Sequence, residues 1–133
     1  MSLLQLKDVG MLYGGRVPAL QGINLTVDKG DWLAIMGPCG SGKTTLMNII
    51  GCMDNHTSGE VILDGINLNN VSKEELTQIR RDKVGMVFQQ FHLISYLTAL
   101  ENVMVAQYYH SMIDEKEALE ALRKVGLADR AKH

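Results

Sequence analysis

Apolar residues along this chain follow two spacings, one typical of strands and one typical of helices. Short alternating or continuous apolar runs predict strands at residues 3–9, 19–27, 32–36, 60–63 and 84–88. Longer periodic runs predict helices at residues 45–50 and 72–81, and two more helices are expected after Thr98 and after Asp114, the last of which stops at Gly126. Strands alternate with helices from residue 32 onward, which predicts an α/β fold, and an antiparallel β region at residues 1–31 precedes it.

Three of the predicted helices begin at a capping sequence, in which a side chain that can cap a helix is followed three residues later by Glu. The pairs are Ser72 with Glu75, Thr98 with Glu101, and Asp114 with Glu117. In the last helix we expect Ala118, Leu122 and Val125 to share one apolar stripe that stops at Gly126.

Two short polar segments predict tight turns. Residues 28–31, Asp-Lys-Gly-Asp, would lead from one antiparallel strand into the strand at 32–36. Asp64-Gly65 would end the strand at 60–63. Because Gly65 directly follows the aspartate, we interpret residues 61–64 as a hairpin arm rather than as a metal-binding strand end.

Composition narrows the class of protein. The chain has 133 residues, of which 46% are hydrophobic, so it suits one folded domain. Its 13 basic and 15 acidic residues leave no basic excess for nucleic acid. No apolar run reaches the roughly 18 residues of a membrane span, and the N-terminus does not resemble a secretion signal. The two cysteines have no metal-ligand spacing, which predicts a reducing, cytoplasmic location.

The most informative motif is a G-x-x-x-x-G-K-[ST] match between the strand at 32–36 and the helix at 45–50. It consists of Gly37, Pro38, Cys39, Gly40, Ser41, Gly42, Lys43 and Thr44. Glycines let main-chain N–H groups face phosphate oxygens, Lys43 can reach the β- and γ-phosphates, and the Thr44 hydroxyl can coordinate Mg²⁺. The helix N-terminus adds its dipole and unpaired N–H groups. A glycine turn with no ligand is the structural alternative.

Further segments occur in the order found in one large family. They are residues 30–32 (Gly-Asp-Trp), 57–61 (Thr-Ser-Gly-Glu-Val), 64–65 (Asp-Gly) and 87–89 (Val-Phe-Gln). With the phosphate loop, they make the whole chain resemble the nucleotide-binding subunits of ATP-binding-cassette (ABC) transporters, a phosphate-loop NTPase fold. Residues 47–52 and 97–103 are similar to the branch with macrolide exporters and lipoprotein-releasing systems.

The resemblance implies roles for individual residues. Tyr13 would stack on adenine, although it could be an ordinary strand aromatic. Gln89 would contact Mg²⁺ and the attacking water, or it could be a polar residue at a strand end. Thr45 would add a hydroxyl to the phosphate cradle, or it could only help to start the helix. Cys39 replaces the serine more common in the family and is either a reactive thiol or a tolerated small residue.

The resemblance also implies partners: ATP with Mg²⁺, a second nucleotide-binding subunit, and a transmembrane permease that holds the protein at the cytoplasmic face of the membrane. Lys43 and Gln89 would then be catalytic.

Three elements of the family do not occur in the sequence: a Leu-Ser-Gly-Gly-Gln signature, an apolar strand ending in Asp-Glu, and a following switch histidine. We therefore expect residues 1–133 to be the N-terminal part of an ABC-type domain, truncated before the signature, with residues 32–133 as its phosphate-loop core. Without its later neighbours, a strand at 32–36 would have unpaired edges, which predicts that the chain self-associates, rearranges or is only marginally folded.

Two functions stay open at this point. The chain is the front part of an ABC ATPase whose parent powers transport, or it is a non-catalytic nucleotide-binding or interaction module. Small nucleotide kinases and GTPases fit less well, because 36 residues precede the loop and no Asn-Lys-x-Asp motif is present.

Overall fold

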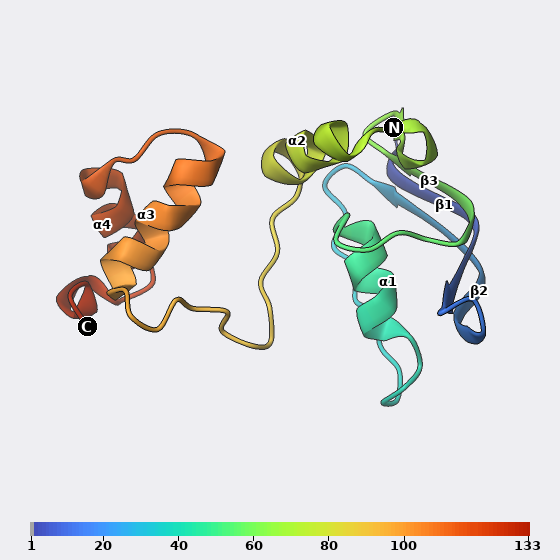
Figure 1. The fold of residues 1–133 in the computed structure, drawn as a ribbon, viewed down its shortest axis with the longest axis horizontal. Helices are drawn as coiled ribbons and strands as arrows, with labels where there is room; N and C mark the ends of the chain where they lie inside the picture. The colour runs from blue at the N-terminus through green and yellow to red at the C-terminus, as the bar shows by residue number, and fades with distance from the viewer. Residues whose placement is uncertain (1) are drawn as a thin grey trace. The chain divides into compact units, whose positions relative to one another are not determined.

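The computed structural model describes residues 2–133 as two compact units, which meet in sequence between Gly85 and Met86 (Figure 1). The first unit contains a sheet and two helices, and the second contains two helices. The strands are β1 (Ser2–Tyr13), β2 (Val17–Asp28), β3 (Ser58–Leu63) and β4 (Ile66–Asn67). The helices are α1 (Lys43–Ile50), α2 (Lys73–Lys83), α3 (Ala99–His110) and α4 (Glu115–Lys124), with 3-10 turns η1 (Leu68–Asn70) and η2 (Ala128–Arg130).

The sheet of the first unit is antiparallel throughout, in the order β2-β1-β3-β4. The hairpin between β1 and β2 confirms the predicted N-terminal β region, and β3 and β4 extend the same sheet. The predicted Asp64-Gly65 turn joins β3 to β4, and both residues have positive φ, 49° and 80°. That conformation is the one required by a two-residue hairpin turn.

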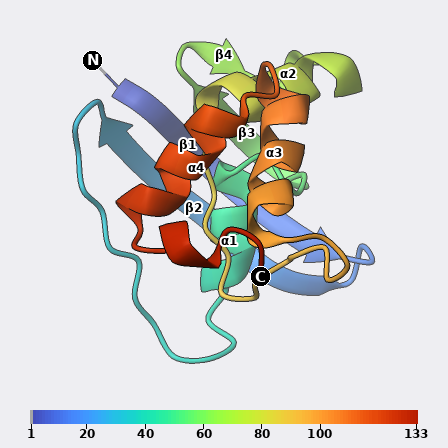
Figure 2. The ribbon, with the colours of Figure 1, turned by 90° about the vertical axis from the view of Figure 1, so that its left-hand side faces the viewer.

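Helix α1 packs against this sheet (Figures 1 and 2). It contributes Ile49, whose side chain is 1% exposed, and α2 contributes Ile79. The buried core around them is Leu4, Leu6, Val9, Met11, Leu20, Cys52, Val61 and Leu63. The core therefore fixes the helix that carries the phosphate loop to the strands of the first unit.

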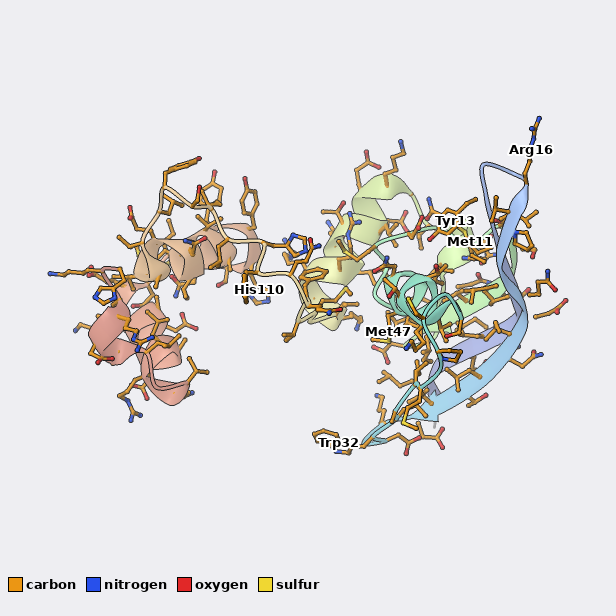
Figure 3. All side chains as sticks on the ribbon, turned by 90° about the horizontal axis from the view of Figure 1, so that it is seen from below. Met11, Tyr13, Arg16, Trp32, Met47 and His110 are labelled. Atoms are coloured by element: carbon orange, nitrogen blue, oxygen red, sulfur yellow. The ribbon has the colours of Figure 1, made fainter. Side chains whose placement is uncertain are left out.

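Two predicted strands do not form. Residues 32–36 and 84–88 have no strand structure, and Trp32 and Val87 are fully exposed. Trp32 projects away from the sheet in Figure 3. A strand is stabilised by neighbouring strands, and no strand of residues 2–133 pairs with either segment. The unpaired strand edge from which we expected self-association is thus absent among residues 2–133, and self-association itself stays a prediction.

The capping sequences are confirmed as helix starts. Ser72 Oγ accepts a hydrogen bond from the Glu75 N–H at 3.1 Å. Thr98 and Glu101 form a complete capping box, and Asp114 caps α4. Each signal acts within one helical turn, which is why sequence alone locates it.

In the second unit, α3 and α4 pack together, and Ala118 and Leu122 of the predicted stripe are buried. Val125 is 68% exposed, so its place in the stripe is wrong, because α4 ends at Lys124 and Gly126 turns the chain with a φ of 78°. Gln107 joins the end of α3 to the start of α4: its side chain donates to the Asp114 carbonyl and accepts from the Asp114 N–H. No helix among residues 2–133 is both long and apolar enough to cross a bilayer.

Three charged residues link the edges of the first unit. Asp64 lies 2.7 Å from Lys83 Nζ and 3.8 Å from Lys29 Nζ. The hydrogen bond from Lys83 lowers the pKa of the Asp64 carboxyl below its ordinary value, and the charges of both lysines act in the same direction. This ion pair ties the end of α2 to the β3–β4 turn.

Candidate functional site: a phosphate-binding loop

The loop at residues 37–44 leads directly into α1, as the motif predicts. Gly42 is the N-cap and provides no side-chain cap. The first helical hydrogen bond runs from the Leu46 N–H to the Gly42 carbonyl at 2.9 Å. The N–H groups of Lys43, Thr44 and Thr45 come before the repeating helical pattern, so they are free of intrahelical partners. They can bind an anion at the positive end of the helix.

The conformation of Gly42 explains why glycine stands there. Its φ is 93°, and a Cβ at this position would lie 2.8 Å from the Ala19 carbonyl oxygen of β2. Any side chain would therefore strain the backbone and push the loop off the hairpin. Contact with β2 thus fixes where α1 begins.

Lys43 lies across the loop rather than pointing into solvent. Its Nζ donates a hydrogen bond to the Gly37 carbonyl, which joins the two ends of the loop. An ammonium has three N–H donors, so two remain for phosphate oxygens. Within the loop, the Ser41 N–H donates to the Pro38 carbonyl at 3.1 Å, so this amide is used internally.

Tyr13 and Thr45, which were predicted separately, lie in contact. The Tyr13 hydroxyl at the end of β1 is 3.1 Å from Thr45 Oγ1 in the first turn of α1. Tyr13 remains 41% exposed, so part of its ring faces solvent. In Figure 3, Arg16 projects from the hairpin tip, whereas Tyr13 lies on the side of α1. The structure therefore brings the predicted base-stacking residue to the phosphate loop.

The two cysteines differ in environment. Cys39, within the loop, is exposed, and Cys52, in the core behind α1, is buried. Burial raises the pKa of the Cys52 thiol above its ordinary value, with the charge of Arg80 opposing this. Alkylating reagents attack the thiolate, so they should favour Cys39.

Comparison with known proteins identifies the family. The model of the ABC transporter family matches residues 20–133. The chain belongs to this family. It is 47% identical to the ABC transporter ATP-binding protein MJ0796 of Methanocaldococcus jannaschii, over 96% of this chain and 58% of that protein. It is 40% identical to the macrolide export ATP-binding/permease protein MacB of Neisseria gonorrhoeae, over 98% of this chain and 21% of that protein.

A solved structure agrees with this assignment. The ATP-binding cassette MJ0796, in a dimeric post-hydrolysis state bound to ADP and Pi, has a TM-score of 0.88 and 45% identity, and the match covers 98% of this chain and 60% of that one. The predicted fold class, a phosphate-loop ABC ATPase with an antiparallel β region, is confirmed. The chain spans about three fifths or less of the length of these relatives.

Gln89 lies in the second unit, in an irregular and exposed segment that follows Phe88. The loop, Tyr13 and Thr45 belong to the first unit. The role of Gln89 beside the nucleotide therefore stays a prediction, and so do the roles of the loop residues.

The sequence analysis missed one contact that supports α1, the helix that follows the phosphate loop. Arg80 of α2 donates from its guanidinium to the Cys52 carbonyl at 3.2 Å, just beyond the end of α1. No local pattern marks this contact, because the two residues are 28 positions apart. It connects α2 to the helix that follows the phosphate loop.

Proposed function

We propose that residues 37–45 bind the phosphates of ATP and that the chain acts as the ATP-binding part of an ABC transporter. The observation that carries this proposal is the loop geometry: unpaired N–H groups at the start of α1 and the Lys43 ammonium lie at the same short segment. Members of the ABC ATPase family bind ATP, and this chain belongs to that family.

Each site residue has a distinct proposed task. Lys43 neutralises the β- and γ-phosphates, and the Thr45 hydroxyl donates to a phosphate oxygen. The exposed Thr44 hydroxyl suits Mg²⁺, which prefers oxygen ligands. Tyr13 offers its exposed ring to adenine, and Gln89 orients the attacking water in the parent ATPase. Mg²⁺ would neutralise charge on the phosphates when bound.

We propose further that residues 1–133 form part of one nucleotide-binding domain, in which residues 1–31 are the antiparallel β region. The dimeric MJ0796 cassette supports a second nucleotide-binding subunit as partner. The ATP-binding/permease nature of MacB supports a transmembrane permease as the other. Through such a permease the chain would lie at the cytoplasmic face of the membrane.

A nucleotide series tests the site. We expect ATP and ADP to bind this chain with Mg²⁺ far more tightly than AMP, because Lys43 and the helix start act on the terminal phosphates. Calorimetric titration with each nucleotide measures the affinities. Equal affinity for AMP and ATP would contradict the proposal.

The second candidate function is a nucleotide-binding module that does not hydrolyse ATP. A phosphate-release assay beside the titration separates the two functions. Turnover that disappears in Lys43→Ala supports the ATPase, and binding without turnover supports the module.

Protection of Cys39 from alkylation provides an independent test. At a nucleotide concentration of ten times Kd about 90% of the sites are filled, so we expect labelling of Cys39 to slow by about tenfold. Cys52, which is 3% exposed, is the internal control and should label slowly with or without nucleotide. Mass spectrometry after timed labelling measures both rates. Equal labelling of Cys39 in the two conditions would argue against a loop that closes over phosphates.

A further inference from the structure

The contact between the Tyr13 and Thr45 hydroxyls joins two elements that are far apart in sequence. The residues are 32 positions apart, and their oxygens lie 3.1 Å from each other. Each hydroxyl can donate or accept, so without nucleotide either residue can be the donor of this hydrogen bond.

Both ends of this contact are held in place by neighbouring bonds. The Leu12 N–H, next to Tyr13, donates to Thr57 Oγ1 at 2.8 Å. The Arg16 N–H donates to the Tyr13 carbonyl at 3.1 Å and closes the hairpin turn. On the other side, Thr45 belongs to the first turn of α1, whose start is fixed by the close approach of Gly42 to Ala19. The contact therefore joins two anchored positions.

A bound phosphate would give the contact a direction. Ionised phosphate oxygens only accept hydrogen bonds, so Thr45 must use its one hydroxyl hydrogen to reach them. Its oxygen can then only accept from Tyr13. Hydrogen bonds in a chain strengthen one another, and a phenolic O–H is a good donor.

We propose that Tyr13 is a positioning residue that acts through Thr45: its O–H donates to Thr45 Oγ1, and the Thr45 O–H donates to a phosphate oxygen of the nucleotide. Tyr13 thus has two separate tasks, one for its ring face toward the base and one for its hydroxyl toward the phosphates. This proposal rests on the proposed function, because it needs a nucleotide in the loop.

A double-mutant cycle in this chain tests the link. The variants are Tyr13→Phe, Thr45→Val and the double variant, each titrated with ATP and Mg²⁺. Loss of one exposed hydrogen bond should weaken binding by about two- to tenfold in each single variant. Both single variants break the same chain of hydrogen bonds. The affinity of the double variant for ATP should therefore be close to that of the single variant that binds ATP more weakly. Thr45→Ser keeps the hydroxyl and should bind like the wild type.

A base series distinguishes the two tasks of Tyr13. The factor lost in Tyr13→Phe should be the same for ATP, GTP and CTP, because it acts on the phosphates. Tyr13→Leu removes the ring as well and should cost additional affinity, more for the purines than for CTP. Thermal unfolding without nucleotide separates a loss of stability from a loss of affinity. A merely structural contact would lower the unfolding temperature of Tyr13→Phe without nucleotide, whereas the proposed link lowers the affinity at unchanged stability.

The outcomes separate this link from the function on which it rests. Full affinity in Tyr13→Phe, or a double variant whose loss equals the product of the single losses, overturns the link alone. Failure of the wild type to bind ATP, or binding unchanged by Lys43→Ala, overturns the proposed function and the link together.

Discussion

Replacing Lys43 by alanine is expected to weaken binding of ATP with Mg²⁺ by at least about 100-fold. The ammonium lies across the loop on the Gly37 carbonyl and keeps two N–H donors for phosphate oxygens. Charge-assisted hydrogen bonds contribute about 1.5–3 kcal/mol each, so the loss of two costs about 3–6 kcal/mol, or more than a factor of 100. Calorimetric titration of the variant measures the change.

The matched control for this experiment is Lys73→Ala. Lys73 is exposed at the start of α2, and its replacement makes the same change in net charge without touching the loop. The affinity of the Lys73→Ala variant for ATP should stay within about twofold of that of the wild type. If both variants bind equally well, Lys43 does not contact the phosphates. Thermal unfolding of both proteins verifies that neither loss comes from unfolding.

Replacing Ile49 by alanine is expected to lower the free energy of unfolding by about 2–5 kcal/mol. Ile49 is 1% exposed and is the α1 residue that lies fully in the core of the sheet unit, with Leu46 and Ile50 packed against that core. Truncation removes buried apolar surface and leaves a cavity, since the strands on the other side cannot move in to fill it. Urea denaturation followed by circular dichroism measures the change.

Met47 on the same helix is the comparison for Ile49. Its side chain is 46% exposed, so Met47→Ala should cost no more than about 1 kcal/mol. A cost for Ile49→Ala no larger than that for Met47→Ala would show that α1 is not anchored as described. Since α1 carries the first turn of the proposed phosphate site, Ile49→Ala should also weaken ATP binding where the protein is partly unfolded.

Local signals in the sequence were sufficient for the helices. The caps at Ser72, Thr98 and Asp114 predicted the starts of α2, α3 and α4, because a cap needs only residues within one turn. The Asp64-Gly65 turn was predicted for the same reason, and residues 61–64 form the hairpin arm that was expected. The phosphate loop was located by its motif, and the family comparison agrees.

The predicted strands at 32–36 and 84–88 were wrong because an apolar run does not specify its partners. Both runs have the composition of buried strands, yet Trp32 and Val87 are exposed in the described chain. A strand gains its hydrogen bonds from neighbours that can lie anywhere in the sequence. The apolar pattern therefore indicated that these segments tend to form strands, but it did not show which strands they would pair with.

By itself, the sequence determined the capped helix starts, the Asp64-Gly65 turn and the family, since each depends on residue types at short, fixed spacings. The chemistry of the loop stays a prediction from the same kind of spacing. Only the tertiary structure decided which distant groups meet: Tyr13 with Thr45, Gly42 with Ala19, and Arg80 with the Cys52 carbonyl. These contacts join elements that only the folded core brings together, so no local pattern in the chain can encode them.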